Sequence, residues 1–443
     1  MATVKPRSFL RAGAALALVL AACGGSKSSA GPDPQPTAAP IQSGAAVASG
    51  AASAAPTVQL ASVVLPADTE PPGDAVHGKK VFEDFECARC HEGTDTKSPS
   101  FEKQCFGCHV QIVSGKFKGP KGAEARWHDR VLDLQFAPSF VGSNKRFRRT
   151  WITNFILNPY DIRPRLGPTM PRLPLTREQA RDVAAYLGMP DDPAAKPDFS
   201  KADPENGRKL MGGQGCPSCH VFSGAPKIAG EAAVDPKETH INQGLALAPD
   251  LRHTRDRWRP EAVIAWIQNA KAIKPDTQMP EYHLTAEQAR DIAAFILLTP
   301  LEKQVLPAAA ARLPVLDRPV KFDEVSEKVF RRTCWHCHGE PDYAAGDGGP
   351  GNTGGFGFKP RGVSFVDYGS VASGMVDEAG ARHSLFEKTA DGTPKIIKVL
   401  LARRDEEAGK ADPALRGMPL GYSSLSPEDI QLVESWVAQG RPR

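Results

Sequence analysis

Residues 216–220 read Cys-Pro-Ser-Cys-His, a pair of cysteines separated by two residues and followed at once by a histidine. The same pattern recurs at residues 87–91, 105–109 and 334–338. These four copies hold eight of the nine cysteines in a chain of 443 residues, so the cysteines are not a random set of thiols. Positions three apart lie about one helical turn from each other, which places both thiols and the histidine side by side.

A C-x-x-C-H segment is the attachment motif of c-type haem. The two thiols bind the two vinyl groups of one haem, and the histidine then lies under the iron as an axial ligand. The first two pairs together also resemble a four-cysteine zinc site, and a single pair resembles a thioredoxin-like redox site, but neither explains a histidine after every pair. The sequence therefore predicts four covalently bound haem c groups. Their thiols are Cys87, Cys90, Cys105, Cys108, Cys216, Cys219, Cys334 and Cys337, and their proximal ligands are His91, His109, His220 and His338.

Length and composition exclude several classes of protein. A chain of 443 residues suggests about three domains. A hydrophobic fraction of 41% is enough to form cores, which excludes a wholly disordered chain. No uncharged apolar run reaches about 18 residues, so we expect no lasting membrane-spanning helix.

Residues 1–22 are predicted to be an export signal peptide. Three basic residues precede an apolar stretch that is too short to span a bilayer. This stretch ends in Leu-Ala-Ala-Cys23, which resembles the bacterial lipobox. The resemblance implies that Cys23 is acylated and anchors the chain stably to a membrane. An ordinary signal peptide followed by a stray cysteine is the alternative.

Residues 23–74 would comprise the lipidated cysteine and a disordered linker. The segment is rich in Ala, Pro, Ser and Gly and cannot bury enough apolar surface to offset its ordering entropy. Without residues 1–22 the formal net charge falls from +4 to +1. This balance argues against a nucleic-acid partner.

The chain repeats itself around the motifs. A short amphipathic segment begins at Gly78 and at Gly207, nine residues before the first cysteine of its motif, and a third begins at Glu327. Downstream, a Met-Pro pair precedes a second amphipathic pattern in each copy, and the three methionines are Met170, Met279 and Met418.

These closing patterns carry helix-start signals. Thr176 with Gln179, and Thr285 with Gln288, have the spacing of a capping box. In the third copy, Ser426 is followed by proline and two acidic residues, as at an N-cap. We therefore expect a closing helix in each copy.

The order of short helix, C-x-x-C-H, proline-containing loop, Met-Pro and closing helix resembles the class I cytochrome c module over nearly all of residues 75–443. The resemblance implies that the first and last helices cross beside each haem. It also implies that Pro138 and Pro249, which follow the nearest upstream motif histidine at identical spacing, support the proximal ligands. The implied sixth ligands are Met170, Met279 and Met418.

The predicted fold class is therefore all-α, with three tandem class I cytochrome c-like domains after a disordered lipoprotein tether. Residues 75–190 would form a dihaem domain, and residues 200–300 a monohaem domain. Residues 320–443 would form a second monohaem domain that contains a Gly-rich insertion.

The first domain has two motifs and a single Met-Pro pair. The helix spacing assigns the first helix to the Cys87 site, whereas the spacing from His109 to Pro138 assigns the Met170 loop to the Cys105 site. We therefore expect Met170 on the Cys105 haem, which leaves the Cys87 haem as the extra one.

The sixth ligand of the extra haem stays open at this point. His128 is the first candidate and His77 the second, but His240 holds nearly the same place as His128 in the second domain, which has no spare haem. The iron could also lack a sixth ligand. Four further histidines are predicted to be surface residues or to support other groups. These histidines are His253, His283, His336 and His383.

A haem with both axial positions filled cannot bind a substrate at its iron and passes single electrons, and a methionine ligand raises its reduction potential. We therefore expect a lipid-anchored tetrahaem cytochrome in the envelope of a bacterium, periplasmic-facing or attached to the outer membrane. Its donor would be a membrane respiratory complex, quinol-oxidising or dehydrogenase, and its acceptor a protein or a terminal oxidase or reductase.

No catalytic residues are predicted, because the sequence contains no hydrolase triad, metal-binding carboxylate cluster or phosphate-binding loop. The competing function is a haem enzyme, a peroxidase or an oxidoreductase of sulfur or nitrogen oxyanions, that uses one open-coordinate haem. A structural zinc protein is the third possibility.

Overall fold

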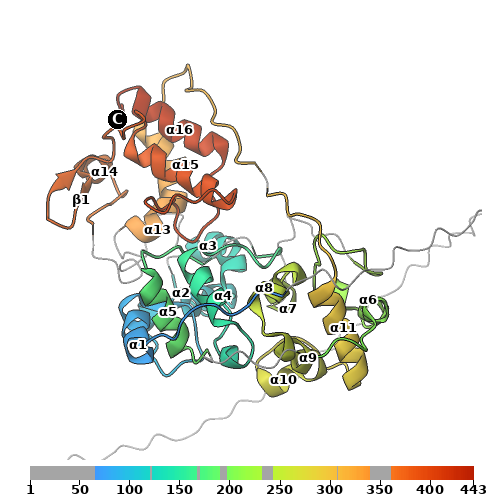
Figure 1. Cartoon of the computed structure of the whole chain (residues 1–443). Coiled ribbons are helices and arrows are strands. Elements are labelled where there is room, and N and C mark those ends of the chain that lie inside the picture. Colours follow the sequence, from blue (N-terminus) through green and yellow to red (C-terminus); the bar gives the residue numbers. More distant parts are fainter. Residues whose placement is uncertain are drawn as a thin grey trace, which may run out of the picture. The chain divides into compact units, whose positions relative to one another are not determined.

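The computed structural model describes the chain from residue 65 onward (Figure 1). The predicted signal peptide, Cys23 and the linker up to residue 64 lie outside the described residues, as does most of the Gly-rich insertion. None of the described helices is long and apolar enough to cross a membrane. All described residues belong to one compact unit. The described ranges are 65–119, 122–166, 170–189, 197–231, 243–306, 308–339 and 361–443.

The described chain is mostly helical, as expected. Residues 65–189, here the first segment, contain α1 (Ala75–Asp84), η2 (Cys87–Arg89), η3 (Phe101–Lys103), α2 (Cys105–Val113), α3 (Ala123–Val131), η4 (Leu132–Leu134), η5 (Ser143–Lys145), α4 (Arg149–Leu157) and α5 (Arg177–Tyr186). Residues 197–306, the second segment, contain α6 (Pro204–Gly213), η6 (Cys216–Ser218), α7 (Gln243–Leu247), η7 (Leu251–His253), α8 (Thr254–Arg257), α9 (Pro260–Gln268), α10 (Ala270–Ile273) and α11 (Ala286–Leu298).

Residues 308–443, the third segment, contain the only strands in the described ranges. These are β1 (Met375–Val376) and β2 (Arg382–His383), which pair as an antiparallel two-residue ladder. The helices of this segment are α12 (Phe322–Val325), η8 (Ser326–Cys334), α13 (Trp335–His338), α14 (Tyr368–Ser373), α15 (Lys395–Glu407) and α16 (Pro427–Ala438).

The first and last helices of the first two segments cross at a glycine. In the first segment α1 packs against α5, and in the second α6 packs against α11. A Cβ on Gly78 would lie 1.8 Å from the carbonyl oxygen of Asp182, and a Cβ on Gly207 would lie 2.1 Å from that of Asp291. Backbones this close leave room for no side chain, so only glycine fits. The predicted crossing is confirmed in both segments.

Two buried aspartates hold these crossings. Asp182 Oδ1 accepts the backbone N–H of Asp74 at 2.9 Å, and Asp291 Oδ1 accepts that of Asp203 at 2.9 Å. Asp74 and Asp203 are in turn the N-caps of α1 and α6. Each carboxylate is only 3% exposed, and the hydrogen bonds offset the cost of its burial.

The predicted helix starts are confirmed. Thr176 with Gln179, and Thr285 with Gln288, each make both hydrogen bonds of a capping box at the starts of α5 and α11. Ser426 caps α16 by accepting a backbone N–H three residues on. These local signals were sufficient because a cap needs only its own turn.

The third segment reaches its motif differently. In the first two segments a left-handed residue, Glu86 (φ 51°) or Gly215 (φ 72°), separates the first helix from the first cysteine. In the third, α12, η8 and α13 form one continuous helical run from residue 322 through the motif. Here η8 is a π-helix, whose wider turn replaces the break.

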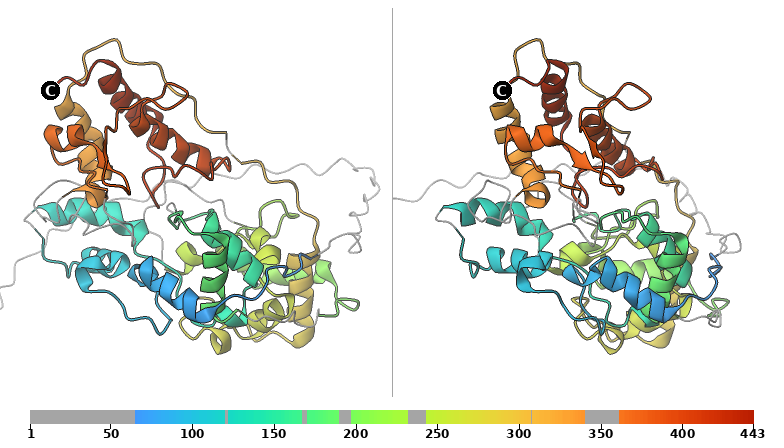
Figure 2. Two further views of the ribbon diagram at one scale, coloured as in Figure 1. Left: turned by 60° about the vertical axis from the view of Figure 1, so that its left-hand side comes forward. Right: turned by 90° about the vertical axis from the view of Figure 1, so that its left-hand side faces the viewer.

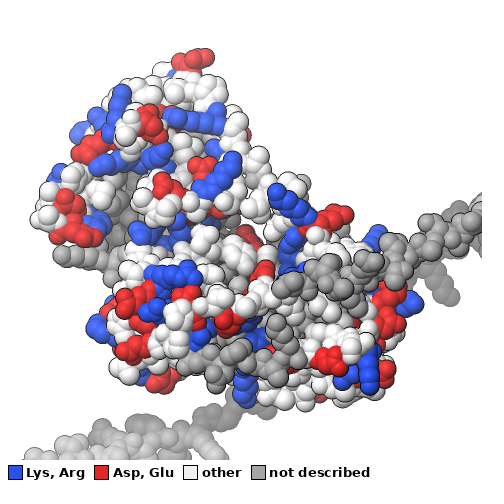
Figure 3. All heavy atoms as spheres, in the orientation of Figure 1, with Lys and Arg blue, Asp and Glu red and all other residues white. Residues whose placement is uncertain are grey.

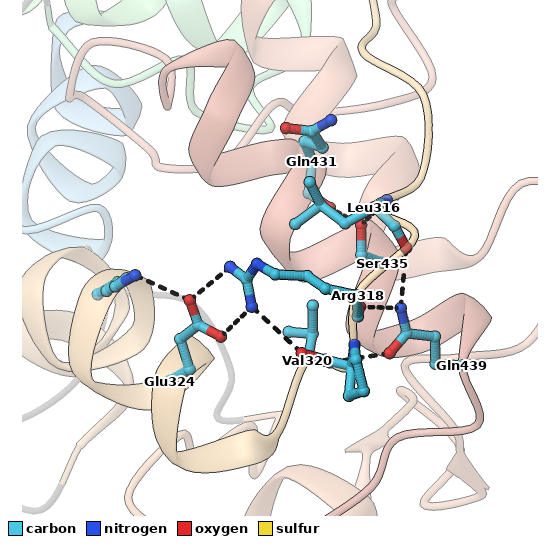
Figure 4. Close-up of polar contacts among 9 residues, drawn as sticks. Leu316, Arg318, Val320, Glu324, Gln431, Ser435 and Gln439 are labelled. Atoms are coloured by element: carbon cyan, nitrogen blue, oxygen red, sulfur yellow. Dashed lines mark hydrogen bonds and ion pairs between the residues drawn. The ribbon is translucent and has the colours of Figure 1, made fainter.

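An extended stretch before α12 is bound along α16 (Figure 4). The N–H groups of Leu316 and Val320 donate to Ser435 Oγ and Gln439 Oε1, both at 2.9 Å. Gln439 Nε2 donates back to the carbonyl oxygens of Leu316 at 3.1 Å and Arg318 at 2.9 Å. The start of the third segment is therefore tied to its last helix.

The apolar core divides into four clusters. Each segment has a large one, and in the third segment, orange to red in Figure 2, the helices pack around Trp436, which is 1% exposed. A fourth, small cluster consists of Ile112, Trp127 and Val131, which all come from the middle of the first segment.

The first and second segments are joined by a short antiparallel bridge. Phe147 pairs with Trp258 across the junction. Two hydrogen bonds of 2.9 Å flank this pair, from Arg148 N–H to Arg257 O and from Arg259 N–H to Arg146 O. The two segments thus meet through matching stretches, residues 146–148 of the first and residues 257–259 of the second.

Candidate haem sites

The structure shows no disulfide among the eight motif cysteines. In the described part of the chain, no three or more His, Cys, Asp or Glu side chains gather as they would around a metal ion.

Each motif forms a helical turn that holds the cysteines and the histidine together. The N–H of His91 donates to Cys87 O at 3.1 Å, and the N–H of His220 donates to Cys216 O at 3.0 Å. In the second and fourth motifs the turn belongs to α2 and to the run from η8 into α13. The local geometry is that expected from the spacing.

The predicted proximal histidines are oriented by backbone carbonyl groups. Nδ1 donates to Pro138 O at 2.9 Å in His91, to Leu134 O at 2.8 Å in His109 and to Pro249 O at 2.9 Å in His220, while His338 bonds to the backbone of Val363. A carbonyl oxygen only accepts, so Nδ1 carries the proton and Nε2 keeps its lone pair. This is the tautomer that an iron ligand requires.

Burial keeps these imidazoles neutral. Desolvation lowers the pKa of His91, His220 and His338, and it lowers the pKa of His109 to about 4. All four side chains therefore hold no extra proton at neutral pH and can donate a lone pair to a metal.

Burial also opposes thiolate formation at the motif cysteines. It raises the pKa of Cys87 and Cys334 to about 12 and that of Cys108 and Cys216 to about 11. Cys105 is the exception, because its hydrogen bond with Cys90 lowers its pKa.

The expected partner of Pro138 was wrong. Pro138 O accepts from His91, not from His109, and occupies the same place as Pro249 O beside His220. The adjacent backbone agrees, because Phe140 N–H donates to Glu92 O at 2.8 Å as Leu251 N–H donates to Val221 O at 2.8 Å. The separation between the histidine and its proline is 47 residues in the first copy and 29 residues in the second.

The additional length in the first copy equals the separation between its two motifs. Pro138 therefore follows His109 at the same spacing as Pro249 follows His220, which is why spacing alone selected the wrong histidine. The second motif belongs to an insertion within the loop that follows His91. The observation that assigned Met170 to the Cys105 site no longer holds.

The insertion has its own small core. Its helix α2 packs against α3, with Ile112, Trp127 and Val131 buried between them and Cys108 partly buried beside them. The thiols of Cys90 and Cys105 form a hydrogen bond with each other. The first two motifs are therefore adjacent although their cores are separate.

The loop with Met279 lies next to the motif of the second segment. Trp266 Nε1 in α9 donates to Met279 Sδ at 2.8 Å, which fixes the thioether. Tyr282, three residues on, has its pKa raised to about 12 by burial and by the neighbouring Cys216 and Cys219. The Met-Pro loop and the cysteines thus enclose one space.

The other two methionines are half-buried. Met418 packs against the core cluster of the third segment, as does Cys334 of its motif, and its N–H donates to Val399 O at 2.9 Å. Met170 begins the stretch that leads to α5, and Thr169 before it lies outside the described residues.

His77, a candidate sixth ligand, takes part in the helix packing of the first segment. Its Nδ1 donates to Asp182 Oδ2 at 2.6 Å in the crossing of α1 and α5. Asn206 makes the corresponding bond in the second segment, donating from Nδ2 to Asp291 Oδ2 at 2.8 Å. This position therefore serves helix packing in both segments, and the candidate role of His77 as a haem ligand stays a prediction.

The remaining histidines differ in their surroundings. His128 is on α3, with its side chain 36% exposed and bonded to the neighbouring Asp129 at 3.1 Å. His383 pairs with Asp377, as expected near the surface. His253 is buried, and its ring centre lies 5.2 Å from that of Tyr160. His240 lies outside the described residues.

A cluster of buried arginines at the junction of the first two segments was missed by sequence reasoning. Burial lowers the pKa of Arg146 and Arg163 to about 10 and that of Arg257 to about 9. Arg163 is close enough to lower the pKa of His91, and Arg257 lowers that of His220. The only signal in the sequence was the arginine-rich composition of the two stretches that meet at this junction.

These arginines fit a haem group. Among the described residues, Arg257 Nε and Nη1 have no hydrogen-bond partner although both atoms are buried. The guanidinium lies over the rings of Phe147 and Trp151, and an anion would satisfy its two unbonded donor atoms. Haem carries two propionate carboxylates, and together with the thiols and the oriented imidazoles these donors provide what one haem needs at each of His91 and His220.

One comparison with known proteins identifies part of the chain. The family model described as Cytochrome c matches residues 204–299, which run from the start of α6 to the end of α11. A comparison with curated proteins finds no match. Residues 204–299 are therefore similar to a cytochrome c domain, and this similarity implies covalently bound haem c and supports a haem-based role in electron transfer.

Proposed function

We propose that the protein is a membrane-anchored tetrahaem c-type cytochrome that transfers single electrons in a bacterial cell envelope. The observation that carries the proposal is the fourfold recurrence of one site. Each C-x-x-C-H motif forms a turn, and each motif histidine is buried or half-buried and bonded to a backbone group. The cytochrome c domain at residues 204–299 supports reading the other copies in the same way.

The proposal places three cytochrome c domains in the chain, at residues 75–190, 200–300 and 320–443. The first two share the glycine at the helix crossing, the buried aspartate and the capping box. The third shares the motif, the Met-Pro pair and the capped closing helix. The first domain differs by the insertion that carries the second motif.

This correspondence supports a revised assignment of the methionines. His91 holds the place of His220, so the Cys87 haem matches the haem of the second domain, and Met170 then matches Met279. The third domain would use Met418. The extra haem is accordingly the one at Cys105 and Cys108, within the insertion.

Haem c, when bound, takes up and releases one electron at its iron. The protein residues determine how readily this happens. Methionine sulfur favours the reduced iron, and a buried surrounding limits the reorganisation that accompanies a change in charge. The cations Arg146, Arg163 and Arg257 would hold the propionates and offset their charge.

The donor and the acceptor are proposed by their chemistry. A membrane quinol-oxidising or dehydrogenase complex would release its two electrons one at a time to this protein. A protein carrier or a terminal oxidase or reductase would remove them. Acidic and basic side chains are interspersed on the face seen in Figure 3, as suits a carrier with several partners better than a nucleic-acid-binding protein.

Haem content of the purified full-length protein tests the proposal. We expect four haems per chain by pyridine haemochrome assay and intact mass, and an uptake of four electrons in a redox titration. The double variant Cys105→Ser/Cys108→Ser should contain three. A wild-type content of one haem would leave only the domain at residues 204–299 and would refute the tetrahaem proposal.

The anchor is tested separately. Cys23→Ala should release the protein from the membrane fraction to the soluble envelope fraction while its haem content stays at four, because two or three acyl chains are needed for stable binding. Retention of the variant in membranes would contradict lipidation at Cys23.

A further inference from the structure

Two histidines from different segments face each other at the insertion. The ring centres of His109 and His336 lie 6.2 Å apart, and the ring planes are tilted by 39°. His109 is the motif histidine of the insertion, and His336 lies between the two cysteines of the motif in the third segment. Both sides of the pair therefore come from haem-attachment turns.

The separation suits two imidazoles on opposite faces of one iron. A metal–imidazole bond is about 2.0–2.1 Å long, and adding the distance from nitrogen to ring centre on each side gives roughly 6 Å between centres. Such ligands can adopt any mutual tilt, since each ring turns about its own bond. Nδ1 of His109 is engaged by Leu134 O, so its Nε2 is the coordinating atom.

His336 cannot serve the haem of its own motif. His338 is the proximal residue there, and in α13 a residue two positions earlier points about 200° around the helix axis from it. The His336 ring accordingly lies on the other side of the turn, toward His109. Its Nδ1 is buried, as expected of a side chain enclosed at a contact between segments.

The contact that brings these histidines together is supported elsewhere. Arg172, two residues after Met170, forms an ion pair of 3.0 Å with Glu406 of α15, and both side chains are nearly buried. Arg172 also donates to Asp412 O at 2.9 Å and to Leu415 O. Glu406 in turn accepts the N–H of Gly417 at 2.8 Å, next to Met418. The first and third segments are thus joined by buried polar contacts.

We infer that His336 is the sixth ligand of the haem attached to Cys105 and Cys108. This inference rests on the proposed four-haem assignment and deepens it. It gives His336 a ligand role in place of the expected surface or supporting role. It favours His336 over the earlier candidates because the His336 ring faces that of His109, whereas His77 lies at the crossing of α1 and α5 and the side chain of His128 is 36% exposed.

Two consequences follow for the function. The iron has no open position, so the chain is an electron carrier and not an enzyme that binds substrate at this haem. The His/His haem has a lower reduction potential than the three His/Met haems. His336 also adjoins Cys337, so it links the haem of the insertion directly to the attachment site of the third domain.

The test compares His336→Ala with the matched control His128→Ala in the full-length holoprotein. Haem content is measured first, because a wild-type value other than four refutes the proposed function and not this inference. In His336→Ala, one quarter of the iron should become high-spin by electron paramagnetic resonance, one carbon monoxide should bind per chain after reduction, and added imidazole should restore the low-spin form. Wild type and His128→Ala should show none of these changes.

A second variant covers the case in which His336→Ala loses a haem. His336→Met keeps a ligand at the position, so all four haems should stay low-spin while the near-infrared band of Met-ligated ferric haem increases by one third. The inference is overturned if both His336 variants have the wild-type spectrum, or if His128→Ala is the variant that becomes high-spin.

Discussion

The first and second segments of this protein are two versions of one domain that differ by an insertion. Both have an N-terminal helix that crosses a closing helix at a glycine, a buried aspartate at the crossing and a proline carbonyl behind the motif histidine. Only the first lengthens the loop after that histidine and places a second motif there. The difference shows that a second C-x-x-C-H motif can be added within a loop without disturbing the frame around it.

The largest effect is expected at the helix crossing that both segments share. Gly78→Ala and Gly207→Ala should each destabilise the protein by about 3 kcal/mol, because the new Cβ meets backbone and cannot be accommodated by a side-chain movement. Thermal unfolding of the holoprotein followed by circular dichroism measures the loss. Gly213→Ala, at the end of α6 where no atom lies within 4 Å, should be neutral or slightly stabilising. Equal losses at Gly207 and Gly213 would refute the role of the crossing.

The next prediction concerns the methionine of the first segment. If His91 truly matches His220, Met170→Ala should remove one third of the near-infrared band of Met-ligated haem. The double variant Cys87→Ser/Cys90→Ser should remove the same third, whereas Cys105→Ser/Cys108→Ser should leave the band intact. A band lost in the Cys105→Ser/Cys108→Ser protein instead would return Met170 to the inserted haem.

The junction of the two segments predicts a change in potential. Arg257→Gln removes a buried positive charge beside His220, so the oxidised haem becomes relatively more stable. We expect the midpoint potential of at least one His/Met haem to fall by on the order of tens of mV. Arg208→Gln, which removes a surface arginine paired with Glu205, is the matched control and should leave all potentials unchanged. A potentiometric titration that cannot tell Arg257→Gln from wild type would contradict a propionate-binding role.

The smallest effect should come from His77, which is ionisable and stands where the second segment has Asn206. The hydrogen bond to Asp182 raises the pKa of His77 above 6.5, whereas Asn206 at the matching position does not titrate. The pair therefore stabilises the fold fully below about pH 6.5, and this contribution is lost as pH rises through the raised pKa.

Exchanging these two residues sharpens the comparison. His77→Asn should flatten the dependence of the melting temperature on pH above 6.5, and Asn206→His should introduce such a dependence through Asp291. Identical pH profiles for the wild type and both variants would show that the charge of His77 does not contribute to stability.

Sequence patterns were reliable wherever the structure depends on neighbouring residues. The motif turns, the capping boxes at Thr176 and Thr285, and the N-cap at Ser426 each form within about one helical turn, so spacing predicts them directly. The glycines of the crossings were also visible, since they begin matching segments. Their reason, contact with the carbonyl oxygens of Asp182 and Asp291, required two helices far apart in the chain.

The sequence by itself determined the turns of the C-x-x-C-H motifs and the helix starts, because thiol pairs and caps act over a few residues. Tertiary structure alone decided which histidine Pro138 supports. The insertion is as long as the separation of the two motifs, so the spacing along the chain is compatible with either His91 or His109. Tertiary structure also decided that Arg257 is buried without a hydrogen-bond partner for two of its donors in the described chain, and that His336 faces His109. Loop length limits how far a chain can reach, but packing determines which group it meets.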